Sequence, residues 1–266
     1  MTIDLQALLP IADRAATMAG DLVRTMAPGV VTAKGDRDMV TEVDHAVERA
    51  VREFLARETP EVGFLGEEGG GGGEGLVWVL DPVDGTANLV HGIPLCAVSL
   101  GLVDAGVPVL GVIDLPFLGV RYSAAAGAGA RAGGTAIRAR DTRDLAGAIV
   151  SIGDYAVGEH ARELNRPRLA LTGELAARVQ RVRMVGSAAI DLAWVAEGRT
   201  DATVMLNNKP WDTAAGSVIA REAGAVVVDV DGSPHTMRSR ATVAAAPGIA
   251  DDFLRLVAEA HRTASS

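Results

Sequence analysis

Apolar residues recur at helical spacing in two stretches near the start of the chain. In residues 4–26 they return every three or four positions, until Pro28-Gly29 ends the run. Residues 41–57 show the same spacing, and Thr41 can cap their first turn. The pattern predicts two long amphipathic helices. The polar segment AKGDRDMV between them contains Lys34.

Short apolar runs follow the second helix and predict strands. Residues 62–65 lead into the acidic motif GEE, and residues 76–80 end at Asp81. The glycine run GGGGGEG lies between them at 69–75. Because glycine has little backbone preference, we expect a mobile surface turn at a hairpin tip. Residues 93–138 alternate apolar runs with turn residues, which predicts short strands paired antiparallel.

The second half of the chain, after about residue 144, alternates strands with helices. This alternation is typical of layered architectures, so we predict an α/β fold, an αβαβα sandwich, with an antiparallel-sheet amino half and a doubly wound carboxyl half. The expected halves are residues 1–144 and residues 145–266. The predicted strands are 148–152, 179–183, 201–206, 226–230 and 241–245, and the predicted helices are 158–177, 187–197, 211–223 and 250–260.

Charge and composition narrow the function classes. The net charge is −9, from 34 acidic and 25 basic residues, and no stripe of Lys and Arg could follow a phosphate backbone. We therefore expect no nucleic-acid partner. An acidic protein that handles an anionic substrate needs cations between the two, which favours bound metal. The five histidines lack the paired spacing of a histidine metal site, and we expect solvated or capping roles for most of them.

The compartment follows from cysteine usage and from the first residues. Cys96 is the single cysteine, which excludes an internal disulfide, fits a reducing compartment and predicts a core residue. The start, MTIDLQALLP, lacks the basic residues of a secretory signal, and no run of about 18 apolar residues predicts a membrane span. We expect a cytoplasmic protein without membrane contact.

The segment WVLDPVDGTANL, residues 78–89, carries the strongest chemical signal. An apolar strand ends at Asp81, and Asp84 follows at the start of a predicted helix. Two carboxylates on one turn suit hard divalent cations, and the backbone N–H groups of Gly85 and Thr86 at a helix start attract phosphate oxygens. Aspartates at such places are also ordinary turn formers and helix caps, so this segment alone leaves both interpretations open.

Further acidic residues stand at the ends of predicted elements. Glu67 follows the strand at 62–65, and a hairpin would bring it beside Asp81. Asp212 in KPWDTAAG begins a helix of small residues, which permit close packing at the helix start, and Asp44 in VTEVD begins the second helix. Taken singly, Asp212 and Asp44 are typical helix-cap residues.

GEE, DPVDGT and WDTAAG, in this order and at this separation, resemble the inositol monophosphatase family of magnesium-dependent, lithium-sensitive phosphatases. The flanking segments VTEVD, VGSAAIDLAWVAEGRTDA and EAGAVVVDVDG extend the similarity over about residues 34–246. The resemblance implies hydrolysis of a small phosphomonoester with two to three Mg²⁺ ions, and a homodimer.

The family pattern also implies a set of metal ligands. By resemblance, Glu67, Asp81 and the Val83 carbonyl hold a first Mg²⁺ ion. The second ion is held by Asp81, Asp84 and Asp212. A third and weaker ion would be bound by Glu67 and water.

The family pattern implies the remaining roles as well. Thr86, paired with Asp44 and assisted by Glu67, orients and deprotonates the attacking water. The binding residues are Gly85 and Thr86 for the phosphate, and Gly186, Ser187 and Ala188, with Asp84 and Asp212, for the alcohol. Lys34 occupies the position of a mobile lysine near the third ion, where an ordinary exposed lysine is the alternative.

One position departs from the inositol-hydrolysing pattern. Met205 stands seven residues before Asp212, where those enzymes carry a glutamate that receives substrate hydroxyls. A thioether is a poor acceptor, and Asn207, Asn208 or Lys209 are candidates to replace it. Inositol 1-phosphate is the leading substrate, with histidinol phosphate and fructose 1,6-bisphosphate as alternatives. The hypothesis from a different class is a regulatory binding protein on the same scaffold.

Overall fold

The computed structural model describes residues 4–33, 35 and 39–265. Its helices are α1 (Leu5–Thr25), α2 (Glu42–Glu58), α3 (Thr86–Val90), α4 (Ala161–Arg178), α5 (Ala188–Glu197), α6 (Pro210–Glu222) and α7 (Ala250–Ser265), with 3₁₀ turns at Leu145–Gly147 and Pro247–Ile249.

The strands form two large sheets and one short pair. The short pair is β1 (Thr32–Ala33) with β2 (Met39–Val40). The first sheet contains β3 (Gly63–Gly66), β4 (Gly70–Gly72), β5 (Leu76–Asp84), β6 (Ala97–Asp104), β7 (Val107–Leu115), β8 (Val120–Ala125), β9 (Ala130–Ala132) and β10 (Thr135–Ala136). The second sheet contains β11 (Ile149–Ile152), β12 (Arg181–Arg183), β13 (Ala202–Met205), β14 (Val226–Val228) and β15 (Thr242–Ala245).

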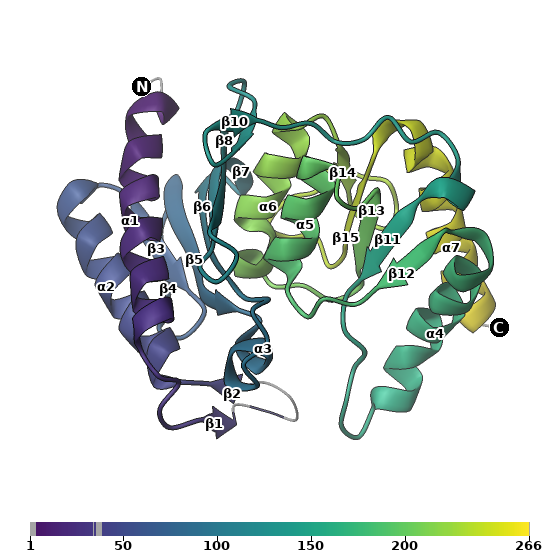
Figure 1. Ribbon diagram of the computed structural model, residues 1–266, viewed down its shortest axis with the longest axis horizontal. Helices are drawn as coiled ribbons and strands as arrows, with labels where there is room; N and C mark the ends of the chain where they lie inside the picture. The colour runs from purple at the N-terminus through teal and green to yellow at the C-terminus, as the bar shows by residue number, and fades with distance from the viewer. Residues whose placement is uncertain (1–3, 34, 36–38, 266) are drawn as a thin grey trace.

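These elements stack in five layers, which confirms the predicted αβαβα sandwich. Figure 1 shows α1 and α2 on one flank, then the eight-stranded sheet, α5 and α6, the five-stranded sheet, and finally α4 and α7. The first sheet runs in the order β10-β9-β8-β7-β6-β5-β3-β4. Within the described ranges, no helix has the length and apolar character needed to cross a membrane.

The outer helices α1 and α2 follow the apolar pattern of their sequence. Asp4 caps α1 by accepting the backbone N–H of Gln6 at 3.1 Å, and Thr41 with Asp44 forms a capping box at the start of α2. The face of α1 that packs against the sheet is built mainly from small buried residues, Ala12, Ala15, Ala16 and Ala19.

The hairpin predicted between the strands at 62–65 and 76–80 is wrong. β3 and β5 are parallel neighbours, and the glycine run supplies the edge strand β4, antiparallel to β3. A Cβ atom on Gly71 would collide with the carbonyl oxygen of Phe64, so glycine is required at this approach. Arg52 covers the edge, because it donates to the Gly70 carbonyl oxygen at 2.9 Å and lies 4.3 Å from the centre of the Phe64 ring.

The second sheet is mixed, with the predicted order of strands and helices. β11 pairs parallel with β12 and β13, whereas β15 pairs antiparallel with β13 and β14. Helices cover both faces, α5 and α6 on one and α4 and α7 on the other (Figure 1). The strands therefore carry apolar residues on both faces, for example Val150 and Val204.

Helix α6 approaches the first sheet closely because two glycines make room for it. Gly101 and Gly111 are register partners on β6 and β7. A Cβ atom on Gly101 would stand 2.6 Å from the Cβ atom of Ala214, and Gly111 faces Ala215 in the same way. The small residues after Asp212 thus pack as the sequence predicts, and the amino end of α6 is held near β5.

Candidate active site

Two neighbouring parallel strands bring Glu67 and Asp81 together. In the parallel pair β3 and β5, Gly66 lies opposite Leu80, and the Glu67 backbone N–H donates to the Leu80 carbonyl oxygen at 3.1 Å. The side chains of Glu67 and Asp81 are within hydrogen-bond range of each other. The expected proximity is therefore correct, but parallel strands produce it instead of a hairpin.

The turn after Asp81 carries the DPVDGT motif. β5 continues as far as Asp84, and its register against β6 changes between these two aspartates. Oδ1 of Asp81 accepts the backbone N–H of Val83 at 3.1 Å, which holds the carboxylate against its own turn. Gly85 has φ +92°, and a Cβ atom there would stand 2.9 Å from the Leu95 carbonyl oxygen. Gly85 therefore lets the chain enter α3 directly after Asp84.

Thr86 opens α3 and contacts a carboxylate from another helix. Its hydroxyl lies 3.1 Å from Oδ1 of Asp44 and 2.9 Å from the Val83 carbonyl oxygen, and its one proton serves one of these acceptors at a time. Asp44 is buried, and its Oδ2 accepts the backbone N–H of Thr41 at 2.9 Å. The α2 capping box thus fixes the carboxylate that holds Thr86.

Asp84 is tied to the start of α5. Its Oδ2 accepts the Ser187 hydroxyl at 2.7 Å and the Ala189 backbone N–H at 2.6 Å. Gly186, with φ +77°, makes the turn before that helix, and Asn88 donates to the neighbouring Val185 carbonyl oxygen at 2.9 Å. Two segments about 100 positions apart in sequence therefore meet at Asp84.

Asp212 reaches the same place from α6. Its Oδ2 accepts the Lys209 backbone N–H at 2.7 Å, so it closes the first turn of the helix. The Ser99 hydroxyl donates to the Trp211 carbonyl oxygen at 3.4 Å, and Ser99 is the register partner of Asp81. The first turn of α6 therefore lies next to Asp81.

The carboxylates raise one another's pKa. Burial, and then Asp84, Glu67 and Asp212, raise the pKa of Asp81 well above its usual value. Burial raises the pKa of Asp84 to about 6, although hydrogen bonds from the Ser187 hydroxyl and backbone N–H groups oppose the shift. For Asp212 burial is again the largest cause, and its pKa is raised to about 7.

The chemistry of these donors fits a hard divalent cation. Glu67, Asp81, Asp84 and Asp212 carry carboxylate oxygens that repel one another, and a doubly charged ion would remove that repulsion. Among the residues that the structure describes, no three acidic side chains are arranged closely enough to coordinate one metal ion together. One carboxylate oxygen of Asp84 accepts hydrogen bonds from Ser187 and Ala189. One carboxylate oxygen of Asp212 accepts a hydrogen bond from Lys209. Lys34 lies outside the described residues.

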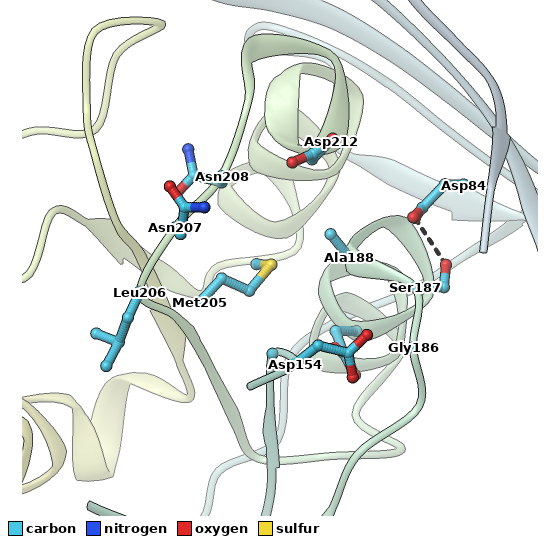
Figure 2. Close-up of a pocket in the computed structure, with 12 residues that line it drawn as sticks. Asp84, Asp154, Gly186, Ser187, Ala188, Met205, Leu206, Asn207, Asn208 and Asp212 are labelled. Atoms are coloured by element: carbon cyan, nitrogen blue, oxygen red, sulfur yellow. Dashed lines mark hydrogen bonds between the residues drawn. The ribbon is translucent and has the colours of Figure 1, made fainter. Parts of the chain in front are cut away.

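A cavity of about 180 Å³, here called the site cavity, opens beside Asp84 and Asp212. Figure 2 shows Ser187 next to Asp84, with Met205 and Asp154 on other walls. The five residues predicted to bind the alcohol all line it. Its lining consists of Asp84, Gly153, Asp154, Gly186, Ser187, Ala188, Asp191, Met205, Leu206, Asn207, Asn208 and Asp212.

Sequence reasoning missed Asp154 and Asp191 in this lining. Asp154 comes two residues after the apolar strand β11, much as Asp81 follows an apolar run in the sequence, and this signal could have identified it. Asp191 lies in the first turn of α5 and is 1% exposed. Cys96 is a core residue as predicted, and burial with the nearby Asp84 and Asp44 raises the pKa of its thiol to about 12.

Comparison with known proteins identifies the family of the chain. Residues 4–263 match the model of the inositol monophosphatase family, and the chain belongs to that family. Its members are phosphoric monoester hydrolases, so the chain is an enzyme of that class.

Named relatives and solved structures cover most of the chain. Inositol-1-monophosphatase ImpA of Mycolicibacterium smegmatis is 39% identical over 226 residues, which cover 84% of this chain and 82% of ImpA. Nus factor SuhB of Pasteurella multocida is 35% identical, with 94% of this chain and 95% of SuhB covered. The structure of the Thermotoga maritima IMPase superposes with a TM-score of 0.89 at 30% identity, covering 96% of this chain and 98% of that one.

Proposed function

We propose that this enzyme hydrolyses a small phosphomonoester with two to three Mg²⁺ ions, and that inositol 1-phosphate is its leading substrate. The observation that carries the proposal is that Glu67, Asp84 and Asp212, from three separate segments, lie close enough to Asp81 to raise its pKa, and that Asp84 and Asp212 line the site cavity. Bound Mg²⁺ would neutralise the phosphate and lower the pKa of a water molecule.

The proposal assigns metal binding, phosphate binding and orientation of the attacking water to different residues. Glu67, Asp81, Asp84, Asp212 and the Val83 carbonyl hold the ions. The backbone N–H groups of Gly85 and Thr86 bind the phosphate. The Thr86 hydroxyl donates to Asp44, so its oxygen is free to accept a hydrogen bond from the attacking water and orient it, and Glu67 assists in removing the proton of that water.

The alcohol part of the substrate would occupy the site cavity. Gly186, Ser187 and Ala188 form one wall, and Met205 lies where the inositol-hydrolysing pattern has a glutamate. The family name and the relative named ImpA favour inositol 1-phosphate. Histidinol phosphate and fructose 1,6-bisphosphate remain the alternative substrates.

A substrate panel tests the proposal. Phosphate release is measured from the three candidate substrates with Mg²⁺, with EDTA and with added Li⁺. We expect turnover that requires Mg²⁺, falls with Li⁺ and is lost in Asp84→Asn. Asp251→Asn, an exposed change on α7, is the matched control. Turnover that survives Asp84→Asn would contradict the assigned mechanism.

A second candidate function is a regulatory binding protein on the same scaffold, because a relative of similar identity is named a Nus factor. A pull-down that recovers a stoichiometric protein partner, together with negligible turnover on every phosphomonoester, would favour it. We also propose a cytoplasmic homodimer. Sedimentation of the purified protein and fractionation of cells test these two expectations.

A further inference from the structure

A line of hydrogen bonds runs behind the site cavity and has no part in the proposed chemistry. His235, between β14 and β15, is 2% exposed, and its Nε2 lies 2.8 Å from Oγ1 of Thr242 while its Nδ1 lies 3.5 Å from Oγ of Ser217. Oγ1 of Thr242 lies 3.0 Å from Oδ1 of Asn208. Nδ2 of Asn208 donates to the Ser239 carbonyl oxygen at 3.3 Å.

One direction of donation satisfies the whole line. A carbonyl oxygen only accepts, so the amide NH₂ of Asn208 faces Ser239 and its Oδ1 faces Thr242. The single proton of the Thr242 hydroxyl is therefore donated to Asn208. The oxygen of Thr242 then accepts the N–H on Nε2 of His235, and Nδ1 of that ring accepts the Ser217 hydroxyl.

The surroundings of His235 keep its ring neutral, as this arrangement requires. Burial, followed by the Arg221 guanidinium, lowers the pKa of His235 to about 4. Arg221 also donates to the His235 backbone carbonyl oxygen at 2.6 Å, which holds the segment in place. A neutral imidazole offers one donor and one acceptor, which match Thr242 and Ser217.

Asn208 belongs to the loop between β13 and α6, which forms one wall of the site cavity. Leu206 and Asn207 line the cavity from the same loop (Figure 2). The next residue, Lys209, donates its backbone N–H to Asp212. Both ends of the Asn208 amide bond to groups outside the cavity lining, so the amide anchors the wall from behind.

We propose that Thr242 and His235 are positioning residues that hold this wall through Asn208 and thereby set the affinity of the site for the alcohol part of its substrate. Neither residue is among those that line the cavity, so the effect passes through Asn208. The proposal rests on the proposed function, because it concerns the cavity that would receive the alcohol.

Kinetics of Thr242→Val test it. Valine removes the hydroxyl at nearly constant volume, and KM and kcat are measured with Mg²⁺ on the preferred substrate of the panel. We expect KM to rise roughly 3–10-fold, as for loss of one hydrogen bond, and kcat to change less than about twofold. Thr242→Ser keeps the hydroxyl and restores KM. Thr200→Val is the matched control, since the buried Thr200 hydroxyl has no partner among the described residues.

A second variant and a spectroscopic readout make the test independent of folding and of turnover. Asn208→Ala, in a half-buried loop position, should raise KM as much as Thr242→Val, and the double variant should be no worse than either one. Nitrogen NMR of the histidines should show the Nε2-protonated neutral form of His235 in the native enzyme. Its Nε2 signal should shift in Thr242→Val.

The outcomes separate the two proposals. If the native enzyme turns over no phosphomonoester, the proposed function fails and this inference fails with it. If turnover is normal but KM is unmoved in both Thr242→Val and Asn208→Ala, only the positioning role is overturned. If Thr242→Val does not fold, KM of Thr242→Ala, which also removes the hydroxyl, decides in its place.

Discussion

The Thr86 hydroxyl lies 3.1 Å from Oδ1 of Asp44, although 42 positions separate the two residues. The contact joins the turn of the DPVDGT motif to the capping box of α2. A residue that fixes a helix start thus also fixes a hydroxyl at the candidate active site.

Thr86→Val should lower kcat by roughly 10²–10⁴-fold with little change in KM, because the oxygen that orients the attacking water is lost. Thr86→Ser keeps that oxygen and should retain most of the activity. Asp44→Asn added to Thr86→Val should cost little more, since the two act as a unit. Steady-state kinetics with saturating Mg²⁺ measure the native enzyme, these three variants and Asp44→Asn alone. If the loss of kcat in the double variant equals the product of the losses in the two single variants, Thr86 and Asp44 act independently and the assigned pairing is contradicted.

The metal-free protein should lose stability as the pH rises from about 4 to about 7. The pKa values of Asp84 (about 6) and Asp212 (about 7) are raised above the unfolded value of 3.8, so the native state keeps protons that the unfolded state has released. The free energy of unfolding therefore falls through this window. His235, with its pKa lowered to about 4, acts in the opposite sense, but equally with and without metal.

Calorimetry at several pH values, in EDTA and in Mg²⁺, measures this dependence. Mg²⁺ stabilises the charged carboxylates, so the gain in melting temperature on adding Mg²⁺ should grow between pH 5 and pH 7.5. A gain that stays constant across this range would show that these carboxylates do not bind the ion.

Local sequence predicted part of this site, and contacts distant in sequence explain what it missed. Asp81 and Asp84 were predictable because a strand end, a proline and a glycine mark their turn within a few residues. The pairing of Asp44 with Thr86 was accessible only through the family resemblance, because no local pattern links two helices. Asp154 follows an apolar strand, a local signal, but its place in the lining of the site cavity depends on the packing of β11 beside β13.

The glycine run at 69–75 shows that local sequence is also insufficient to predict part of the fold. Apolar periodicity identified the strands on either side of it, but glycine carries no such signal. Its pairing with β3 depends on the close approach of Gly71 to Phe64 and on Arg52 from α2, which are tertiary contacts. His235 is similar, because its burial comes from the packing of Ser217 and Thr242 around it.

Asp81→Asn should stabilise the metal-free protein while abolishing turnover. Burial and three neighbouring acids raise the pKa of Asp81, so its charged form is unfavourable without a cation. Asparagine keeps an acceptor for the Val83 N–H and removes the charge. We expect a rise of a few degrees in melting temperature in EDTA at pH 7.5, roughly the effect of 1 kcal/mol. An unchanged or lower value would mean that the acids do not repel one another in the folded protein.

Gly101→Ala should lower the free energy of unfolding by about 1–3 kcal/mol, because the new methyl group meets Ala214 and forces α6 away from the sheet. Gly173→Ala is the matched control. Gly173 lies exposed in α4 with open space at its Cβ position, so the same substitution should stabilise by about 0.5–1 kcal/mol. Urea unfolding measures both. Equal effects of the two substitutions would contradict the close packing of α6.

Met205→Glu tests which group receives the hydroxyls of the alcohol. Met205 is 4% exposed at the end of β13 and lines the site cavity, and its thioether is a poor acceptor. A carboxylate there should raise kcat/KM for inositol 1-phosphate by roughly 10-fold, the effect of one charged hydrogen bond. The kcat/KM for a phosphomonoester of a simple alcohol, which has no further hydroxyls, should not change.

The same substitution should lower stability, because it adds a charge near Asp84 and Asp191. Met205→Gln separates the acceptor from the charge, and Met205→Leu controls for volume. If Met205→Glu lowers kcat/KM for inositol 1-phosphate at unchanged melting temperature, the hydroxyls of that substrate are received elsewhere in the cavity. Asn207, two residues after Met205, and Asp154, on another wall, are then the groups to substitute next (Figure 2).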